Sequence, residues 1–114
     1  MRHRDLNACL SDALAAAQTI ERFIGSKSFE QYQADDLLRS GVERQFEIVG
    51  EALNRALKTD PGLPARIPKA PSIVAFRNVL AHGYDAVVDE TVFAIATHDV
   101  PSLVAQLRVL LEEF

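Results

Sequence analysis

The side chains with the greatest capacity for chemistry stand together in the segment Arg77-Asn78-Val79-Leu80-Ala81-His82-Gly83-Tyr84. Arg77 offers a permanent positive charge and a fork of N–H donors that fits phosphate oxygens. His82 carries an imidazole, a common proton carrier near neutral pH, and Tyr84 adds a phenolic hydroxyl. Together these groups favour chemistry at a phosphate ester. A structural alternative stays open at this point: an ion pair for Arg77, a helix-capping His82 and a packed ring of Tyr84.

Arg77 and His82 would not share one face of an unbroken helix. Five residues of helix rotate them about 140° apart and separate them by about 7.5 Å along the axis. Gly83 is typical of a helix end. We therefore expect the helix to end near Ala81, so that His82 lies at its terminus and can turn toward Arg77.

No second group of residues has the spacing of a familiar catalytic or cofactor site. The histidines at 3, 82 and 98 are too far apart for a helical metal pair, and the glycines are spread singly. We therefore expect no metal and no cofactor. The lone Cys9 excludes an internal disulfide, and no apolar run is long enough to span a membrane. These features predict a cytoplasmic protein that does not contact membranes.

The distribution of charge modifies what the net charge implies. The chain has 114 residues and a formal net charge of −4, which argues against nucleic-acid binding. Residues 54–84, however, hold five bases and one acid. Because salt screens charges beyond about 8–10 Å, local charge can decide where phosphate binds. The alternative is an ordinary solvated loop beside acidic helices. In this basic stretch, Arg66 and Lys69 are the candidate phosphate contacts outside the motif.

Apolar residues recur at helical spacing through most of the chain, which predicts an all-α protein. The first helix covers residues 6–24 and is followed by Gly25, a typical helix end. One extra helical turn is expected over residues 28–33. A long helix then starts after Asp35 or Asp36 as its N-cap. Its apolar positions are Leu38, Val42, Phe46, Val49, Leu53 and Ala56 or Leu57.

A proline-rich connection separates the long helix from the motif helix. The long helix ends before Asp60, and four of the five prolines fall between Thr59 and Pro71. Proline interrupts helices and central strands, so we predict a loop there. The motif helix follows, and its apolar positions are Ile73, Phe76 and Leu80.

Two more helices are expected after the motif. Asp89 would cap the first, and Asp99 with Pro101 in the first turn would open the second. Their core positions are Val92 and Ala96, followed by Val104, Leu107, Leu111 and Phe114. Strand-like alternation is not sustained anywhere. We therefore predict one domain over residues 1–114, an antiparallel bundle of four or five helices.

Glu51 lies in the long helix between two small residues, Gly50 and Ala52. Small side chains let helices approach closely, so Glu51 could lie near the motif helix and pair with Arg77 or His82. A solvated glutamate fits the sequence at least equally well. We include Glu51 as a possible supporting residue of the site.

The motif segment resembles the R-N-x-x-x-H-x-Y signature of the HepT-like branch of the HEPN superfamily. In addition, Ile48-Val49-Gly50-Glu51-Ala52 is similar to the I-x-G-E-A segment of that branch. The resemblance covers nearly the whole chain in length and in the order of its helices and loop. It implies an HEPN-like helical bundle.

The resemblance also implies a metal-independent ribonuclease toxin of a type II HEPN/MNT toxin–antitoxin pair. Its members are homodimers in which the two motif helices meet. Their antitoxin is an MNT-type minimal nucleotidyltransferase that attaches AMP to the motif tyrosine, here Tyr84.

In the cleavage mechanism that we expect, the ribose 2′-OH of RNA attacks the adjacent phosphate. His82 acts as general base or acid, and Arg77 stabilises the charge on the phosphoryl oxygens. Asn78 orients the site by hydrogen bonds, and Arg66 and Lys69 are the candidate RNA contacts.

Two other functions remain compatible with the sequence. One is a non-catalytic HEPN-like helical module that binds a nucleotide or a nucleotidyltransferase partner. The other is a dimerisation bundle in which the motif residues are structural. The intact Arg77 and His82 favour the enzyme.

Overall fold

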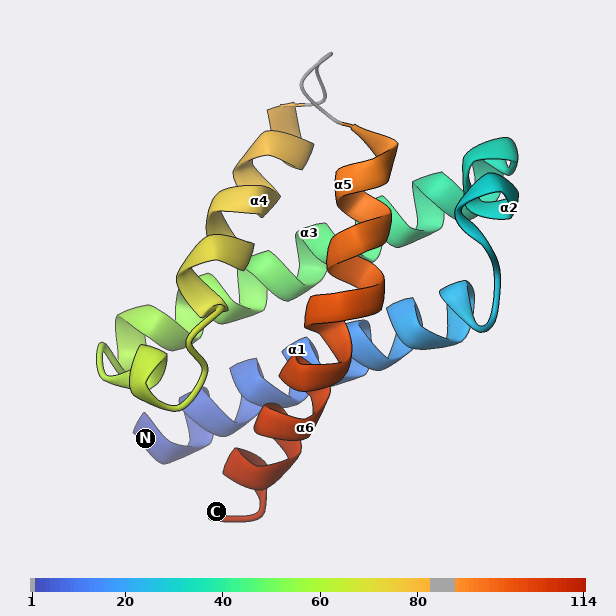
Figure 1. Cartoon of the computed structure of the whole chain (residues 1–114). Helices are drawn as coiled ribbons and strands as arrows, with labels where there is room; N and C mark the ends of the chain where they lie inside the picture. The colour runs from blue at the N-terminus through green and yellow to red at the C-terminus, as the bar shows by residue number, and fades with distance from the viewer. Residues whose placement is uncertain (1, 83–87) are drawn as a thin grey trace.

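The computed structural model describes residues 2–82 and 88–114, and every regular element within them is helical (Figure 1). This confirms the predicted all-α fold class. Among the described helices, none is both long and apolar enough to cross a membrane. In chain order the elements are α1 (Arg2–Ile24), α2 (Phe29–Ala34), α3 (Asp36–Thr59), the 3-10 turn η1 (Leu63–Ala65), α4 (Ala70–His82), α5 (Asp89–Ala94), the π-helical turn η2 (Ile95–Asp99) and α6 (Val100–Leu111).

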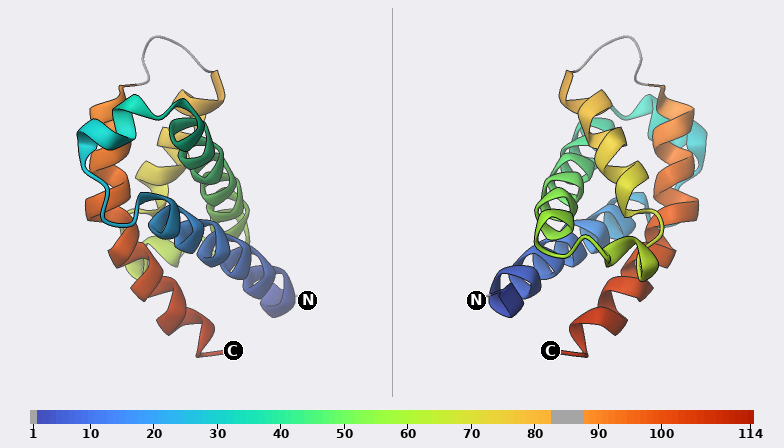
Figure 2. Two further views of the ribbon diagram at one scale, coloured as in Figure 1. Left: turned by 90° about the vertical axis from the view of Figure 1, so that its right-hand side faces the viewer. Right: turned by 90° about the vertical axis from the view of Figure 1, so that its left-hand side faces the viewer.

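The helices form two layers around one core (Figures 1 and 2). The long helices α1 and α3 run antiparallel and side by side, and α4 and the run from α5 to α6 cross them on one side. Both chain ends lie at the same end of the molecule, whereas α4 ends and α5 begins at the opposite end. The largest fully buried side chains are Tyr32, Phe46, Leu10, Ile20, Leu53, Leu63, Ile67, Leu103 and Leu107.

The predicted helix end at Gly25 and the predicted cap at Asp35 are confirmed, whereas α1 starts at Arg2, earlier than the predicted residue 6. Gly25 ends α1 with a φ of 51°, a conformation that glycine adopts without strain. The short α2 begins with a capping box in which Ser28 and Gln31 accept each other's backbone N–H. Asp35 caps α3, where its side chain accepts the N–H of Leu38 at 3.0 Å.

Helix α6 starts at Val100 with Asp99 in the cap position and Pro101 in its first turn, as predicted, but it is not a separate helix, because the chain stays helical from α5 through η2 into α6. Asp99 has helical backbone angles and makes no side-chain cap. The N–H of Val100 bonds instead to the carbonyl of Ile95, five residues earlier. This wider π turn directly precedes Pro101, whose ring would crowd the preceding turn of a regular α-helix. A proline that is read as a helix start therefore lies within a bulged but continuous helix.

Asp89 does not cap α5 as predicted. It is the first residue of the helix, and the cap position belongs to Val88, which has extended backbone angles and no side-chain cap. The Asp89 carboxylate lies 3.8 Å from Nε of Arg39 on α3 instead. Asp89 thus contacts a different helix, and no local pattern in the sequence predicts that contact.

The proline-rich connection is shorter than predicted. Helix α4 begins at Ala70, so Pro71 belongs to its first turn, where a missing N–H costs nothing. Pro64 lies within the 3-10 turn η1. The predicted loop from Thr59 to Pro71 is therefore irregular only in part.

The last helix differs from prediction at its C-terminal end. Val104, Leu107 and Leu110 are buried, and Leu111 is only partly buried. Phe114 was expected in the core but lies beyond the end of α6 and is 45% exposed. The reason is that α6 ends at Leu111, so the helical periodicity does not extend to the last residue.

The crossing of α3 and α4 depends on Gly50. A Cβ atom added at Gly50 would lie 2.6 Å from Cγ of Arg77 and closer still to its Cβ. It would also lie 3.4 Å from the carbonyl oxygen of Ile73. The atoms nearest to Gly50 belong to the stem of Arg77, so they cannot turn away without moving α4. Gly50 therefore sets the distance between the long helix and the motif helix.

We expect Gly50→Ala to lower the free energy of unfolding by about 1–3 kcal/mol, the usual cost of overpacking. Chemical denaturation measures this change. The matched control is Gly41→Ala in the same helix, where the added Cβ would lie 3.1 Å from an edge atom of the Phe23 ring. Because the ring can shift and alanine favours helix, the control should be neutral or stabilising. Equal destabilisation by both substitutions would contradict the role assigned to Gly50.

Candidate functional site

Arg77 is the best-fixed polar residue of the motif. It lies in the middle of α4 against α3, and its Nη2 is 3.1 Å from Oε2 of Glu51. The Arg77 side chain is 23% exposed and that of Glu51 is 56% exposed. The predicted pair between these residues is therefore present. It follows directly from Gly50, because the close approach of the two helices brings Arg77 beside the next residue of α3.

The ion pair leaves part of the Arg77 guanidinium available. Nε of Arg77 is buried and has no hydrogen-bond partner among the described residues. A guanidinium carries five N–H donors in one plane, and the contact with Glu51 involves one terminal nitrogen. The arrangement can therefore direct remaining donors at an anion near the surface while Glu51 holds the plane of the group.

His82 is the last residue of α4 and is exposed. The helix ends one residue later than the predicted end near Ala81. Arg77 and His82 thus belong to the same helix, about 140° apart in direction. We expected an earlier helix end, which would let His82 turn toward Arg77. The geometry of the longer helix does not favour that turn.

Asn78 and Val79 are exposed on α4 between Arg77 and His82. Val79 is one of the few large apolar side chains on the described surface, at 39% exposed. The outer face of the motif helix is therefore mainly apolar or uncharged. The predicted modification site, Tyr84, lies outside the described residues, as does Gly83.

Arg66 and Lys69 are not gathered with the motif side chains. Arg66 makes a two-pronged ion pair with Glu113, one contact of which measures 3.0 Å. This hydrogen bond holds the pKa of the Glu113 carboxyl below its usual value. Lys69 is exposed just before α4, and the length of the helix separates it from His82 by about 20 Å. The bases of this stretch are therefore not gathered at one place, because Arg66 and Lys69 precede α4 and Arg77 lies in its middle.

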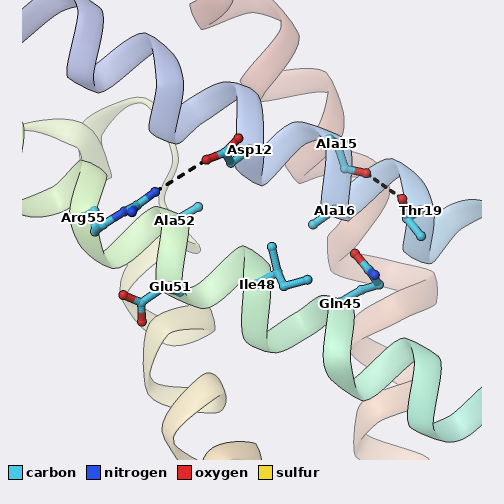
Figure 3. A pocket seen from close by; sticks show the side chains of 9 residues that line it. All are labelled: Asp12, Ala15, Ala16, Thr19, Gln45, Ile48, Glu51, Ala52 and Arg55. Carbon is cyan, nitrogen blue, oxygen red and sulfur yellow. Dashed lines mark hydrogen bonds and ion pairs between the residues drawn. The ribbon is translucent and has the colours of Figure 1, made fainter.

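A groove of about 350 Å³ lies between α1 and α3, and Glu51 is one of the residues that line it (Figure 3). Arg55 reaches Asp12 across it at 3.5 Å, and Glu51 points from its rim toward α4. The remaining lining residues are Ala15, Ala16, Thr19, Gln45, Ile48 and Ala52. Sequence reasoning missed this groove, although the small residues at helical spacing on α1 were a possible signal.

The described residues contain no group of three or more His, Cys, Asp or Glu side chains that could hold a metal ion. The polar groups in contact are a guanidinium and a carboxylate, and an imidazole stands at the end of the same helix, pointing in another direction. They are suited to binding an anion and to transferring protons.

Comparison with known proteins identifies the family. The family model described as "Ribonuclease HepT-like" matches residues 13–110. The chain belongs to the ribonuclease HepT-like family. This confirms the resemblance drawn from the Arg77–Tyr84 and Ile48–Ala52 segments.

Relatives of this HepT-like chain are found in the archaeon Methanocaldococcus jannaschii. The chain is 28% identical over 112 residues to "Putative RNase MJ1380". This alignment covers 96% of this chain and 100% of the relative. It is 24% identical over 115 residues to "Putative RNase MJ0125", covering 99% of this chain and 97% of the relative. No solved structure matches the chain. The family and the names of these relatives support a ribonuclease-like function.

Proposed function

We propose that this HepT-like chain is a metal-independent endoribonuclease toxin of a type II HEPN/MNT toxin–antitoxin pair. The observation that carries the proposal is the position of Arg77, half-buried at the α3–α4 crossing and paired with Glu51 at 3.1 Å. His82 stands exposed at the end of the same helix. A fixed cation near a proton carrier is what cleavage of a phosphate ester requires.

In the proposed reaction the ribose 2′-OH attacks the adjacent phosphorus, and the 5′-oxygen of the next nucleotide leaves. The products are a 2′,3′-cyclic phosphate and a new 5′-hydroxyl. His82 transfers a proton, a contribution of about 10²–10⁴-fold. Arg77 stabilises the charge that builds up on the phosphoryl oxygens, and Asn78 orients the phosphate by a hydrogen bond.

The proposal includes a homodimer in which two copies of α4 meet. Arg77 and His82 of one chain face different directions, so a phosphate could contact Arg77 of one copy and His82 of the other. The exposed Val79 lies between them in sequence and supplies an apolar contact. A closed two-fold pair would present both sites in one groove.

The partner in the proposal is an MNT-type nucleotidyltransferase that acts as antitoxin by attaching AMP to Tyr84. The added phosphate would bring negative charge and bulk close to the site of RNA cleavage. This regulation rests on family resemblance and on the presence of a tyrosine two residues after His82.

We expect the purified protein to cleave cellular RNA in the presence of EDTA. His82→Ala should lower the rate by at least about 100-fold, because it removes a proton-transfer group. Gel electrophoresis of RNA fragments measures the rate. The control is His98→Ala, since His98 is also exposed but lies on η2. Equal cleavage by the wild type and His82→Ala would contradict the role of His82, and loss of activity on chelation would contradict metal independence. No cleavage by the wild type would favour the non-catalytic module.

We expect the wild type to sediment as a dimer and Val79→Glu to sediment as a monomer with little RNase activity. A buried carboxylate without a partner would destabilise the contact between motif helices. The matched control, Val109→Glu, places the same charge on α6 at a valine that is 53% exposed. It should stay dimeric and active. A Val79→Glu variant that remains dimeric would show that α4 is not the contact surface.

We expect a purified MNT-type nucleotidyltransferase with ATP to add the mass of AMP to the wild type and to abolish its RNase activity. Tyr84→Phe should still cleave RNA but should neither gain mass nor lose activity, because it lacks the acceptor hydroxyl. Intact-protein mass spectrometry and the RNA assay give the two readouts. Transfer of AMP to Tyr84→Phe would place the modification at another residue.

A further inference from the structure

Cleavage by a 2′-OH needs two proton transfers. One group must take the proton of the attacking hydroxyl, and another must give a proton to the 5′-oxygen as it leaves. The two transfers occur on opposite sides of the phosphorus, so two different side chains serve them best. In the proposed dimer each phosphate meets one Arg77 and one His82, and the second His82 belongs to the second site. A single His82 can supply only one of the two transfers in a reaction step, which leaves the other role without a residue.

Glu51 is the titratable side chain in direct contact with Arg77. Its Oε2 lies 3.1 Å from Nη2 of Arg77, and more than half of its side chain is exposed. A phosphate bound to the other donors of this guanidinium would lie in the guanidinium plane, as the Glu51 carboxylate does. The 2′-OH is on the carbon next to the scissile phosphate ester, so it would come within reach of Glu51. An ionised carboxylate has only acceptors and is suited to accept a proton.

The backbone keeps this arrangement in register. Gly50 brings Arg77 against α3, and any side chain there would push α4 away. Glu51 follows Gly50 directly, so the distance between the carboxylate and the guanidinium is set by the helix crossing. A group whose geometry is fixed in this way can act on a substrate, whereas a freely solvated glutamate would have to be ordered first.

We propose that Glu51 is the general base of RNA cleavage and that His82 is the general acid, an inference that rests on the proposed function. The 2′-OH proton passes to the Glu51 carboxylate while O2′ forms a bond to phosphorus. The bond from phosphorus to O5′ breaks, and O5′ takes a proton from the His82 imidazolium. The cyclic phosphate and the 5′-hydroxyl are released, and water restores both protonation states.

Glu51→Gln tests this assignment because glutamine keeps the shape and a carbonyl oxygen that can accept the N–H of Arg77. If Glu51 only positioned Arg77, the variant would keep most of its activity. If Glu51 is the general base, its replacement should lower kcat by about 10²–10⁴-fold. The Kd for an RNA with a 2′-deoxy nucleotide at the scissile position, which cannot be cleaved, should differ by less than threefold between Glu51→Gln and the wild type. The control is Glu47→Gln, one turn earlier on α3, which should cleave like the wild type.

A substrate with a good leaving group separates the base from the acid. Nitrophenolate needs no proton to leave, so a uridine 3′-(4-nitrophenyl phosphate) should restore most of the rate to His82→Ala. It should not restore the rate to Glu51→Gln, because the 2′-OH must still lose its proton. Release of nitrophenolate is followed by absorbance.

The outcomes distinguish this inference from the function on which it rests. Failure of the wild type to cleave RNA would overturn both. Cleavage by the wild type together with a Glu51→Gln rate within threefold of it would overturn the base assignment alone, and so would restoration of Glu51→Gln by the nitrophenyl substrate. Loss in Glu51→Gln on both substrates, with intact binding and melting temperature, supports Glu51 as the base.

Discussion

The structure depends on the close approach of α3 and α4 at Gly50. Any larger residue at that position would collide with the stem of Arg77. The crossing buries most of the Arg77 side chain and leaves its partner Glu51 at the surface. A guanidinium that is partly buried and held by a carboxylate loses little freedom when an anion binds to it. The same contact therefore serves helix packing and prepares the site.

Much of the fold was predictable because its signals are local. The caps at Ser28 and Asp35 and the helix end at Gly25 act within one turn of chain, and the apolar stripes record one buried face of each helix. The errors arise where a local signal has two meanings. Pro101 is compatible with a helix start and also with a π turn in a continuous helix. Asp89 has the chemistry of a cap but contacts another helix.

The candidate site was predictable in part for the same reason. Small residues on both sides of Glu51 indicated a close helix contact, and the pair with Arg77 is present. Arg66 could not be assigned from local sequence, because its partner Glu113 lies 47 residues away. The groove between α1 and α3 likewise needs the packing of two helices to exist. Distant contacts of this kind leave no pattern in a single sequence.

Charge pairing bears on how the proposed RNA substrate would be placed on a protein of net negative charge. Arg66 is engaged by Glu113, and Arg55 lies 3.5 Å from Asp12. In the first half of α3, burial and, to a lesser extent, the nearby Asp89 carboxylate raise the pKa of Glu43. Long-range attraction of RNA is therefore weak over much of the described surface, and short-range contacts matter more. Arg77 differs from Arg66 and Arg55 because its partner, Glu51, has a role in the proposed reaction. The Arg77–Glu51 pair fixes the guanidinium in the orientation in which it would bind the phosphate.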